Sequence, residues 1–300
     1  MRVVVSRISK AVAAAFLLLC ACAGAAASRP AARPAQGFAE VNGTRLFYEA
    51  RGEGPAVVLI HGGLVDSRLW DGQVGPLSKR LRVVRYDLRG FGRSAAAPEP
   101  FSHLEDLRAL LDFLKVERAS LVGLSLGGIV AADFALEHPE RVERLVLVGP
   151  GLRGDKQPPS KDLAAVVEAM SRGAEAFADV SMSRELYAAV RPGTAAHALL
   201  RRMLLDNFKA VPTFRLARYP EPPTAERLGQ VRAPTLVVVG SRDAPSLLNI
   251  ADTLAAQIRG ARKVVIEGSS HHPPVEKPKE LNRALLDFLE VKSGKAKGKS

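Results

Sequence analysis

Gly123-Leu124-Ser125-Leu126-Gly127 decides the fold of this chain, because it places a serine between a predicted strand and a predicted helix. The residues before it, Ala119 to Leu124, form a short apolar run typical of a buried strand, and Leu126 to His138 carry apolar side chains at helical spacing. Such a tight reversal forces the serine toward an uncommon backbone conformation and leaves no room for side chains two residues away. This explains the two glycines. The pattern indicates a nucleophilic serine, and the alternative is an ordinary serine in a glycine-rich turn.

Two stretches nearer the N-terminus support the nucleophile. Pro55 to Gly63 (PAVVLIHGG) is an apolar run that ends in His-Gly-Gly, and Leu81 to Ser94 reads LRVVRYDLRGFGRS. In this order, the two stretches and the serine turn resemble the α/β-hydrolase superfamily. They are similar to its strand 3 with the oxyanion turn, its strand 4 with the D-x-R-G-x-G-x-S loop, and its nucleophile elbow on strand 5. The resemblance spans roughly residues 37–291 and is weakest in the middle.

The resemblance implies an α/β fold. We expect a mostly parallel eight-stranded α/β-hydrolase sheet with flanking helices and a small helical cap inserted after strand 6. The hydrolase core then comprises residues 37–151 and 224–291, and residues 152–223 form the cap. Within the cap, Leu200, Met203, Leu204 and Phe208 recur at steps of three and four residues. That stripe indicates packing against the core more than direct substrate contact.

A nucleophilic serine needs a base and a carboxylate that holds the base in one tautomer, and in this superfamily the chain order is Ser, then Asp or Glu, then His. Asp243 follows the predicted buried strand Ala233 to Gly240, at the loop where the family usually carries its acid. Its alternative role is a turn or helix-capping aspartate before Pro245. A second acid position of the family, after strand 6, holds no carboxylate in Leu145 to Leu152.

The spacing of the residues that follow each histidine decides which one is the expected base. In the family the catalytic histidine is followed by Pro at +2, Glu at +5 and Pro at +7, and this spacing selects His271, with Glu276 and Pro278 downstream. His272 is the alternative, as a neighbouring imidazole that lines the pocket or the surface. Ser270 departs from the pattern, because the family often has glycine before the histidine.

The resemblance implies a mechanism in which His271 removes the Ser125 proton, Ser125 attacks a carbonyl carbon, and water clears the acyl-enzyme. Asp243 orients the imidazole. The backbone amides of Gly63 and Leu126 are the expected oxyanion donors, and such a donor is worth about a hundred- to a thousandfold in rate.

The other histidines have different expected roles. His61 belongs to the oxyanion turn, where we assign it a structural role. His103 follows Ser102 in a capping-box pattern in which Ser102 and Glu105 can satisfy free amides at a helix start. His138 and His197 have no metal-ligand spacing with another His, Cys or carboxylate. We therefore expect no metal and no cofactor.

The reaction class is narrowed by residue type. A serine at position 125 disfavours dehalogenases and epoxide hydrolases, which use a carboxylate nucleophile, and His61-Gly62-Gly63-Leu64-Val65 departs from proline iminopeptidases. The motifs resemble carboxylesterases, enol-lactonases and carbon-carbon bond hydrolases. We expect a carboxylesterase-like serine hydrolase that cleaves carboxylic esters of small molecules. The alternatives are a lactonase or carbon-carbon bond hydrolase, a lyase or cofactor-free peroxidation activity on the same triad, and a non-catalytic ligand-binding protein of this fold.

The N-terminus indicates export. Arg2, Arg7 and Lys10 precede an apolar run from Ala11 to Cys22 that is too short to span a membrane, and small residues follow. Residues 1–27 are therefore predicted to be a signal peptide, with 28–36 a flexible linker. Cleavage after the alanine run competes with a lipobox that places lipid on Cys22, and we favour simple secretion slightly. The expected location is the periplasm or the medium, with possible membrane association through lipidation of Cys22.

Composition is that of an ordinary globular enzyme, at 300 residues, 47% hydrophobic and 25% charged. Both cysteines, Cys20 and Cys22, lie in the leader, so the folded part has no thiol for a disulfide or a Cys nucleophile. The formal charge of +12 includes three basic residues in the leader and four in the tail at 292–300, which we expect to be disordered. Without these seven the charge is +5. We therefore expect a small-molecule acyl substrate and no nucleic-acid partner, with the oligomeric state open.

Overall fold

The structure is a computed structural model that describes residues 35–157 and 163–290. These residues belong to one compact unit. The predicted signal peptide, the possible lipid attachment at Cys22, most of the linker, and the basic tail at 292–300 lie outside the described residues, as does the segment 158–162. No described helix combines the length and the apolar character needed to cross a membrane.

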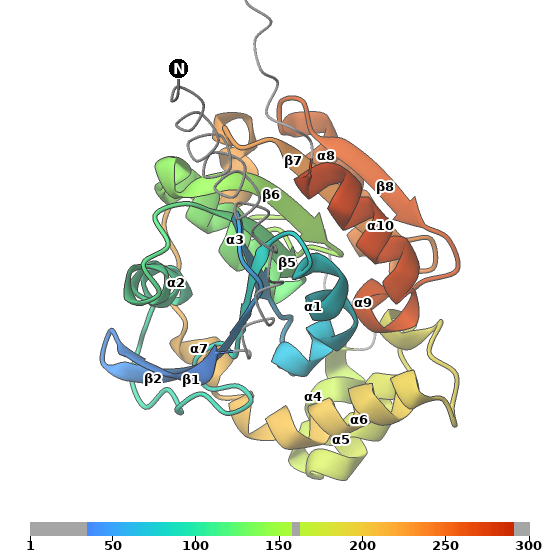
Figure 1. Cartoon of the computed structure of the whole chain (residues 1–300). Coiled ribbons are helices and arrows are strands. Elements are labelled where there is room, and N and C mark those ends of the chain that lie inside the picture. Colours follow the sequence, from blue (N-terminus) through green and yellow to red (C-terminus); the bar gives the residue numbers. More distant parts are fainter. Residues whose placement is uncertain (1–34, 158–162, 291–300) are drawn as a thin grey trace, which may run out of the picture. The chain divides into compact units, whose positions relative to one another are not determined.

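The predicted eight-stranded, mostly parallel sheet is confirmed in the described part of the chain (Figure 1). Its strands are β1 (Ala35–Val41), β2 (Thr44–Arg51), β3 (Ala56–Ile60), β4 (Arg82–Tyr86), β5 (Ala119–Leu124), β6 (Val142–Val148), β7 (Thr235–Gly240) and β8 (Arg262–Ile266). The strand order is β1-β2-β4-β3-β5-β6-β7-β8. β2 pairs antiparallel with β1 and β4, and the remaining neighbours are parallel. The carboxyl ends of the central strands therefore meet at one edge of the sheet.

The central strands are mainly apolar because helices cover both faces of the sheet. In β3, Val57 and Leu59 belong to one apolar cluster, and Val58 and Ile60 belong to the other. This alternation follows from the two-residue period of a strand. A continuous apolar run such as AVVLI is thus the sequence signature of a strand buried on both sides.

The flanking helices divide between the two faces (Figure 1). Apolar residues of α2, α3 and α8 belong to the first cluster, and those of α1 and α10 belong to the second. The helices of the core are α1 (Asp71–Leu77), α2 (His103–Phe113), α3 (Leu126–Glu137), α8 (Pro245–Gln257), α9 (Pro273–Glu276) and α10 (Pro278–Leu289). Short 3-10 helices are η1 (Ser67–Trp70), η2 (Pro139–Arg141), η3 (Glu185–Tyr187), η4 (Phe208–Ala210), η5 (Thr224–Glu226) and η6 (Leu228–Gln230).

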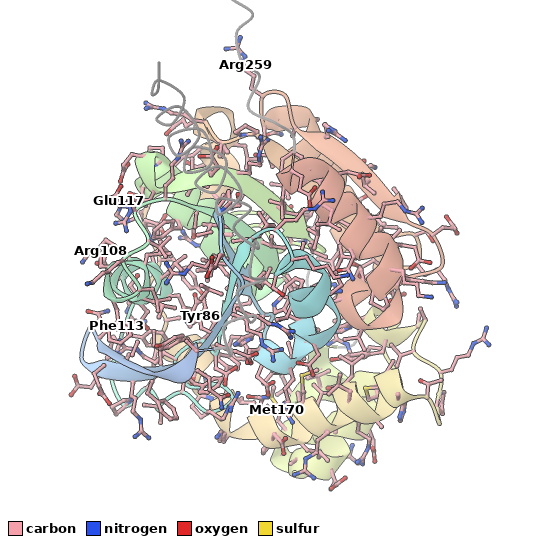
Figure 2. The ribbon with its side chains drawn as sticks, viewed as in Figure 1. Tyr86, Arg108, Phe113, Glu117, Met170 and Arg259 are labelled. Atoms are coloured by element: carbon pink, nitrogen blue, oxygen red, sulfur yellow. The ribbon has the colours of Figure 1, made fainter. Side chains whose placement is uncertain are left out.

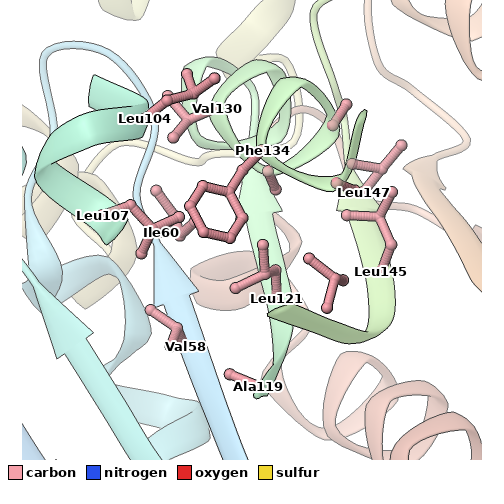
Figure 3. Packing of buried hydrophobic residues seen from close by; sticks show 14 of the residues in the cluster. Val58, Ile60, Leu104, Leu107, Ala119, Leu121, Val130, Phe134, Leu145 and Leu147 are labelled. Carbon is pink, nitrogen blue, oxygen red and sulfur yellow. The ribbon is translucent and has the colours of Figure 1, made fainter. Parts of the chain in front are cut away.

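Helix α3, which begins directly after Ser125, is fixed by the core. Figure 3 shows the Phe134 ring of α3 lying between the sheet and α2, with Leu107 of α2 and Leu121 of β5 near it. Phe134 and Leu121 are fully buried. A buried side chain of this size stabilises by about 1.5–3 kcal/mol relative to an exposed one, so α3 is held by packing and not by helix propensity alone.

Between β6 and β7 the chain forms further helices. They are α4 (Leu163–Ser171), α5 (Ala174–Met182), α6 (Ala195–Asn207) and α7 (Thr213–Leu216). Leu200, Met203 and Leu204 of α6 are buried and belong to the same apolar cluster as Phe177 of α5. These three members of the predicted stripe thus pack inside the protein. The boundaries of the cap at 152 and 223 remain a prediction.

The N-terminus of α2 differs from the predicted capping box. The Ser102 hydroxyl accepts hydrogen bonds from the amides of Leu104 (3.2 Å) and Glu105 (3.4 Å), as the pattern predicts. The Glu105 carboxylate, however, accepts two hydrogen bonds from the Arg108 guanidinium, at 2.8 and 2.9 Å, one turn further along the helix. A charge-assisted pair of this kind competes well with a neutral amide for the same oxygen, so only half of the box forms.

Burial makes His103 a source of pH-dependent stability. Its ring is 1% exposed and packs edge-on against Phe101 at 4.7 Å between ring centroids. Burial, with smaller effects of His61 and Arg89, lowers the pKa of His103 to about 3. The folded protein therefore excludes a proton that the unfolded chain binds below its ordinary pKa of about 6.5, so this stability is present above that pH and is lost as the pH falls.

We predict that His103→Phe weakens this pH dependence. Between pH 7 and pH 5 the wild-type free energy of unfolding should fall by about 2 kcal/mol more than that of the variant, because the variant has no group to protonate at this position. Urea titrations at the two pH values measure the difference within each protein, which cancels any change in packing. Equal falls in the two proteins would contradict the prediction.

Candidate active site

The structure places Ser125 on a strained turn between β5 and α3. Its backbone has φ 52° and ψ −111°, a conformation that costs a residue with a side chain about 1–3 kcal/mol. A Cβ on Gly123 would lie 2.1 Å from the Gly127 carbonyl oxygen, and one on Gly127 would lie 2.2 Å from the Ile60 carbonyl oxygen. The glycines are thus required by close backbone packing. The predicted strand and helix are observed at Ala119–Leu124 and Leu126–Glu137.

The predicted oxyanion donors lie on either side of this turn. Leu126 is the first residue of α3, so its amide has no acceptor within the helix. The loop after β3 approaches the serine closely, since a Cβ on Gly62 would lie 3.4 Å from the Ser125 Cβ. Among the described residues, the backbone hydrogen bonds of turns, loops and helix caps include none that the amide of Gly63 or of Leu126 donates. Their role as oxyanion donors stays a prediction.

His61 fixes the loop after β3, residues 61–66, which we call the oxyanion loop after its expected role. This agrees with the structural role expected for His61. Its ring is fully buried, and Nδ1 donates a 2.7 Å hydrogen bond to the Gly62 carbonyl oxygen. Nε2 accepts a 2.9 Å bond from the Leu88 amide, which fixes the tautomer. Burial, only partly opposed by Asp87, lowers the pKa of His61. The ring therefore remains neutral and joins the loop after β3 to the loop after β4.

His271 and Asp243 form a buried pair. His271 Nδ1 lies 3.1 Å from Asp243 Oδ2, and both side chains are at most 6% exposed. The other carboxylate oxygen of Asp243, Oδ1, accepts a 2.8 Å hydrogen bond from the Ala244 amide, just before α8 begins at Pro245. One oxygen of Asp243 therefore pairs with His271 and the other with the turn before α8, whose N-cap is Ala244, so Asp243 does not cap the helix and its role as the catalytic acid stays a prediction. The pair directs His271 Nε2 away from the carboxylate.

The segment Val148–Gly149 connects this pair to the serine. The Ser125 amide donates a 3.0 Å hydrogen bond to the Val148 carbonyl oxygen. A Cβ on Gly149 would lie 3.0 Å from His271 Nδ1 and 3.2 Å from Asp243 Oδ2. Two consecutive residues at the end of β6 thus contact the nucleophile's backbone on one side and the His-Asp pair on the other. Gly149 lies directly after β6, within the stretch Leu145 to Leu152 that contains no carboxylate.

The Ser125 hydroxyl itself is half-buried and, across residues 35–157 and 163–290, forms no hydrogen bond with a protein group. Hydrogen bonds of a catalytic hydroxyl are often long or poorly aligned without substrate and tighten when substrate binds. Of the two hydrogen bonds expected within the triad, the structure shows the one between His271 and Asp243. The backbone around Ser125 lies next to this pair.

His272 has a different environment from its neighbour. Its ring stacks on Tyr187 of η3 with 4.7 Å between centroids, and its pKa is lowered by burial and then by His271. It is 3% exposed, and its Nδ1 has no partner among the described residues. The Asp243 carboxylate pairs with His271 and with the Ala244 amide, and no described hydrogen bond joins it to His272, so the geometry favours His271 as the base.

Ser270 has a role that the sequence did not reveal. Its hydroxyl lies 2.5 Å from Glu276 Oε1 and 3.1 Å from the Leu186 carbonyl oxygen, and it accepts a 3.3 Å bond from the Ala189 amide. The His271 amide also donates to the Leu186 oxygen, at 3.2 Å. A glycine here would lack the hydroxyl that links the histidine loop to the segment around η3. Only the departure from the family pattern signalled this position.

Asn207, at the end of α6, was also missed. It is fully buried, and its side-chain Nδ2 donates a 2.9 Å bond to Asp66 in the oxyanion loop. Its Oδ1 accepts a 2.7 Å bond from the Gly92 amide in the loop after β4. Burial of Asp66 is outweighed by hydrogen bonds from Arg68 and Asn207, which hold the pKa of that carboxyl below its ordinary value. An ionised carboxylate thus joins α6 to the oxyanion loop.

The D-x-R-G-x-G-x-S loop braces the same region. Asp87 Oδ1 accepts a 2.8 Å bond from the Ser67 amide, and Oδ2 accepts a 2.8 Å bond from the Arg93 amide. The side chain of Ser94 donates to the Asp87 carbonyl oxygen at 2.5 Å.

Within residues 35–157 and 163–290, no three His, Cys, Asp or Glu side chains are placed to hold a metal ion.

Comparison with known proteins agrees with this geometry. The model of a family described as "Alpha/beta hydrolase family" matches residues 57–284. The 2-hydroxy-6-oxo-6-phenylhexa-2,4-dienoate hydrolase of Comamonas testosteroni is 28% identical over 259 residues, covering 81% of this chain and 91% of that one. Carboxylesterase YbfK of Bacillus subtilis is 26% identical over 258 residues, covering 82% and 84%. The structure of the enol-lactonase from Burkholderia xenovorans matches with a TM-score of 0.71 and 29% identity, covering 85% and 100%.

We predict that Gly149→Ala lowers kcat about tenfold or more and leaves KM nearly unchanged, measured on any ester that the protein hydrolyses. The new Cβ must displace His271 or Asp243 by a few tenths of an ångström, and misplaced catalytic groups lose rate steeply. Gly260→Ala is the matched control, because φ there is 73° and no described atom lies within 4 Å of the added Cβ. It carries the backbone strain without the contact. Equal losses of kcat in the two variants would contradict the prediction, because they would assign the loss to backbone strain and not to the contact with His271 and Asp243.

Proposed function

Because the chain belongs to the alpha/beta hydrolase family, we propose that this hydrolase is a serine esterase that cleaves carboxylic esters of small molecules. The observation that carries the proposal is the strained turn at Ser125, which lies between the Gly62–Gly63 loop and the segment that contacts the His271–Asp243 pair. Strain of this kind persists only where surrounding structure enforces it, and it concentrates at reacting groups.

The reaction follows from these positions. His271 Nε2 accepts the proton of the Ser125 hydroxyl while the oxygen bonds to the ester carbonyl carbon. The amides of Gly63 and Leu126 donate to the oxygen that becomes negative. As the C–O bond to the alcohol breaks, His271 returns the proton to that alcohol, and Asp243 stabilises the imidazolium throughout. Water, deprotonated by the same imidazole, then releases the acid and restores the serine.

The names of the relatives support hydrolysis of a carbonyl compound by this site. Their names include a carboxylesterase, an enol-lactonase and a hydrolase of a dienoate. An ester and a lactone each present a carbonyl carbon, and the substrate named for the dienoate hydrolase carries a 6-oxo group, so the proposed triad and oxyanion amides suit attack on each of them. An ester is the substrate class that needs no further group than those described. A purely ligand-binding role would leave the strained backbone of Ser125 and the buried His271–Asp243 pair without a function.

We also propose that the hydrolase acts outside the cytoplasm. Support comes from the leader, in which Arg2, Arg7 and Lys10 precede the apolar run Ala11 to Cys22. Cleavage after Ala27 would release the chain into the periplasm or the medium, and lipid on Cys22 would instead hold it at a membrane.

The esterase proposal predicts that Ser125→Ala abolishes hydrolysis of p-nitrophenyl acetate and p-nitrophenyl butyrate, with a loss of kcat of at least about a thousandfold. Labelling by a fluorophosphonate, mapped by mass spectrometry, should modify Ser125 and disappear in the variant. Parallel assays with lactones and vinylogous diketones identify a lactonase or a carbon-carbon bond hydrolase if those substrates turn over faster. Full ester hydrolysis by Ser125→Ala would refute the assignment.

The export proposal predicts the N-terminus of the mature protein made in a bacterial host. Mass spectrometry should find the chain beginning at Ser28, in the periplasmic or medium fraction. A chain beginning at a lipid-modified Cys22 would establish the second processing route. A cytoplasmic chain that keeps residues 1–27 would contradict export.

A further inference from the structure

A half-exposed phenylalanine lies beside the oxyanion loop. Phe214 belongs to α7, between β6 and β7, and 42% of it is exposed. A Cβ on Gly63 would lie 3.0 Å from Cζ and 3.2 Å from Cε1 of the Phe214 ring. The Leu126 side chain lies 4.0 Å from the same point. The two residues that supply the proposed oxyanion amides are thus bordered by the edge of an aromatic ring.

The Phe214 ring is fixed by contacts with buried aromatic side chains. It packs edge-on against Phe91, with 5.8 Å between centroids, and Phe91 packs edge-on against His61 at 5.4 Å. The aromatic contacts therefore run from the fixed histidine of the oxyanion loop to α7. Such edge-to-face pairs have a preferred geometry, which limits the freedom of the outer ring.

The backbone of α7 is anchored on both sides. The Leu216 carbonyl oxygen accepts a 3.1 Å hydrogen bond from the Phe101 amide, and the Arg218 amide donates a 2.7 Å bond to the Phe101 carbonyl oxygen. Thr213 is buried, and a Cβ on Gly90 would lie only 2.4 Å from its hydroxyl oxygen. Phe214 thus has a rigid position beside the amide of Gly63.

We propose that Phe214 is a specificity-determining residue that limits branching of the acyl group next to the scissile carbonyl. The inference rests on the proposed esterase function. When the carbonyl oxygen binds the amides of Gly63 and Leu126, the atoms attached to the carbonyl carbon come within a few bond lengths of the ring. A straight acyl chain can pass along the exposed apolar surface. A quaternary carbon beside the carbonyl needs the volume that the anchored ring fills.

The test compares p-nitrophenyl acetate, 2-methylpropanoate and 2,2-dimethylpropanoate as substrates. Phe214→Ala should raise the ratio of kcat/KM for the most branched ester to that for the acetate about tenfold or more, since methyl-sized differences in apolar sites are worth about that factor. Phe214→Leu, which keeps more of the apolar volume, should give an intermediate ratio. Circular-dichroism melting shows that each variant is folded, and the Leu variant carries the test if Ala does not fold.

The chain offers a matched control in Phe113. It is 46% exposed, is the last residue of α2 (Figure 2) and packs against Tyr48 of β2. Phe113→Ala should leave the ester ratio unchanged. A uniform change across the three esters in the Phe214 variants, or an equal ratio change in Phe113→Ala, would overturn the proposal.

A second readout separates this inference from the proposed function. Rates of Ser125 labelling by diethyl and diisopropyl fluorophosphates do not require ester turnover. Phe214→Ala should raise the rate with the bulkier reagent relative to the smaller one by a similar factor. Wild-type protein that is labelled but hydrolyses no ester would overturn the esterase function while the labelling ratio still decides the role of Phe214. Wild-type protein that is neither labelled nor active would overturn both.

Discussion

The backbone of Ser125 is the constraint on which the rest of the site depends. Its positive φ is maintained because the turn packs directly against the end of β3, where even one additional carbon at Gly127 would collide with the Ile60 carbonyl. Helix α3 cannot relax this turn, because Phe134 fixes the helix in the core. The strain is therefore balanced by burial some distance away. Its consequence is a half-buried serine at the edge of the sheet where the loops after β3, β6, β7 and β8 converge.

The helices between β6 and β7 are joined to both halves of this site through buried polar contacts. Asn207 connects α6 to Asp66 in the oxyanion loop, and Ser270 connects the histidine loop to the segment around Leu186. Buried hydrogen bonds are costly to leave unmade, so a displacement of these helices would disturb the loops that carry the proposed oxyanion donors and the proposed base together. The position of the cap and the chemistry are in this way coupled by a small number of side chains.

Local sequence patterns predicted the turn at Ser125 and the strands around it, because these depend on neighbouring residues. Asp243 and His271 were instead implied by the resemblance to the α/β-hydrolase superfamily, and the structure shows that these two side chains pair. The remaining features depend on tertiary contacts. Ser270 and Leu186 are 84 positions apart, and Asn207 and Asp66 are 141 apart, so no local pattern reports either contact. Glu105 matched a capping box locally but pairs with Arg108, and Phe214 has no sequence motif at all. Its significance comes from the loop that it contacts.

The most direct measurement is a crystal structure of the protein after reaction with a fluorophosphonate, whose phosphoryl oxygen imitates the developing oxyanion. The account predicts phosphorus bonded to Ser125 Oγ, its oxygen about 2.7–3.1 Å from the amides of Gly63 and Leu126, and His271 Nε2 within hydrogen-bonding reach of Oγ. An adduct whose oxygen points away from both amides, or in which His271 lies too far from Ser125 for any bond, would contradict it.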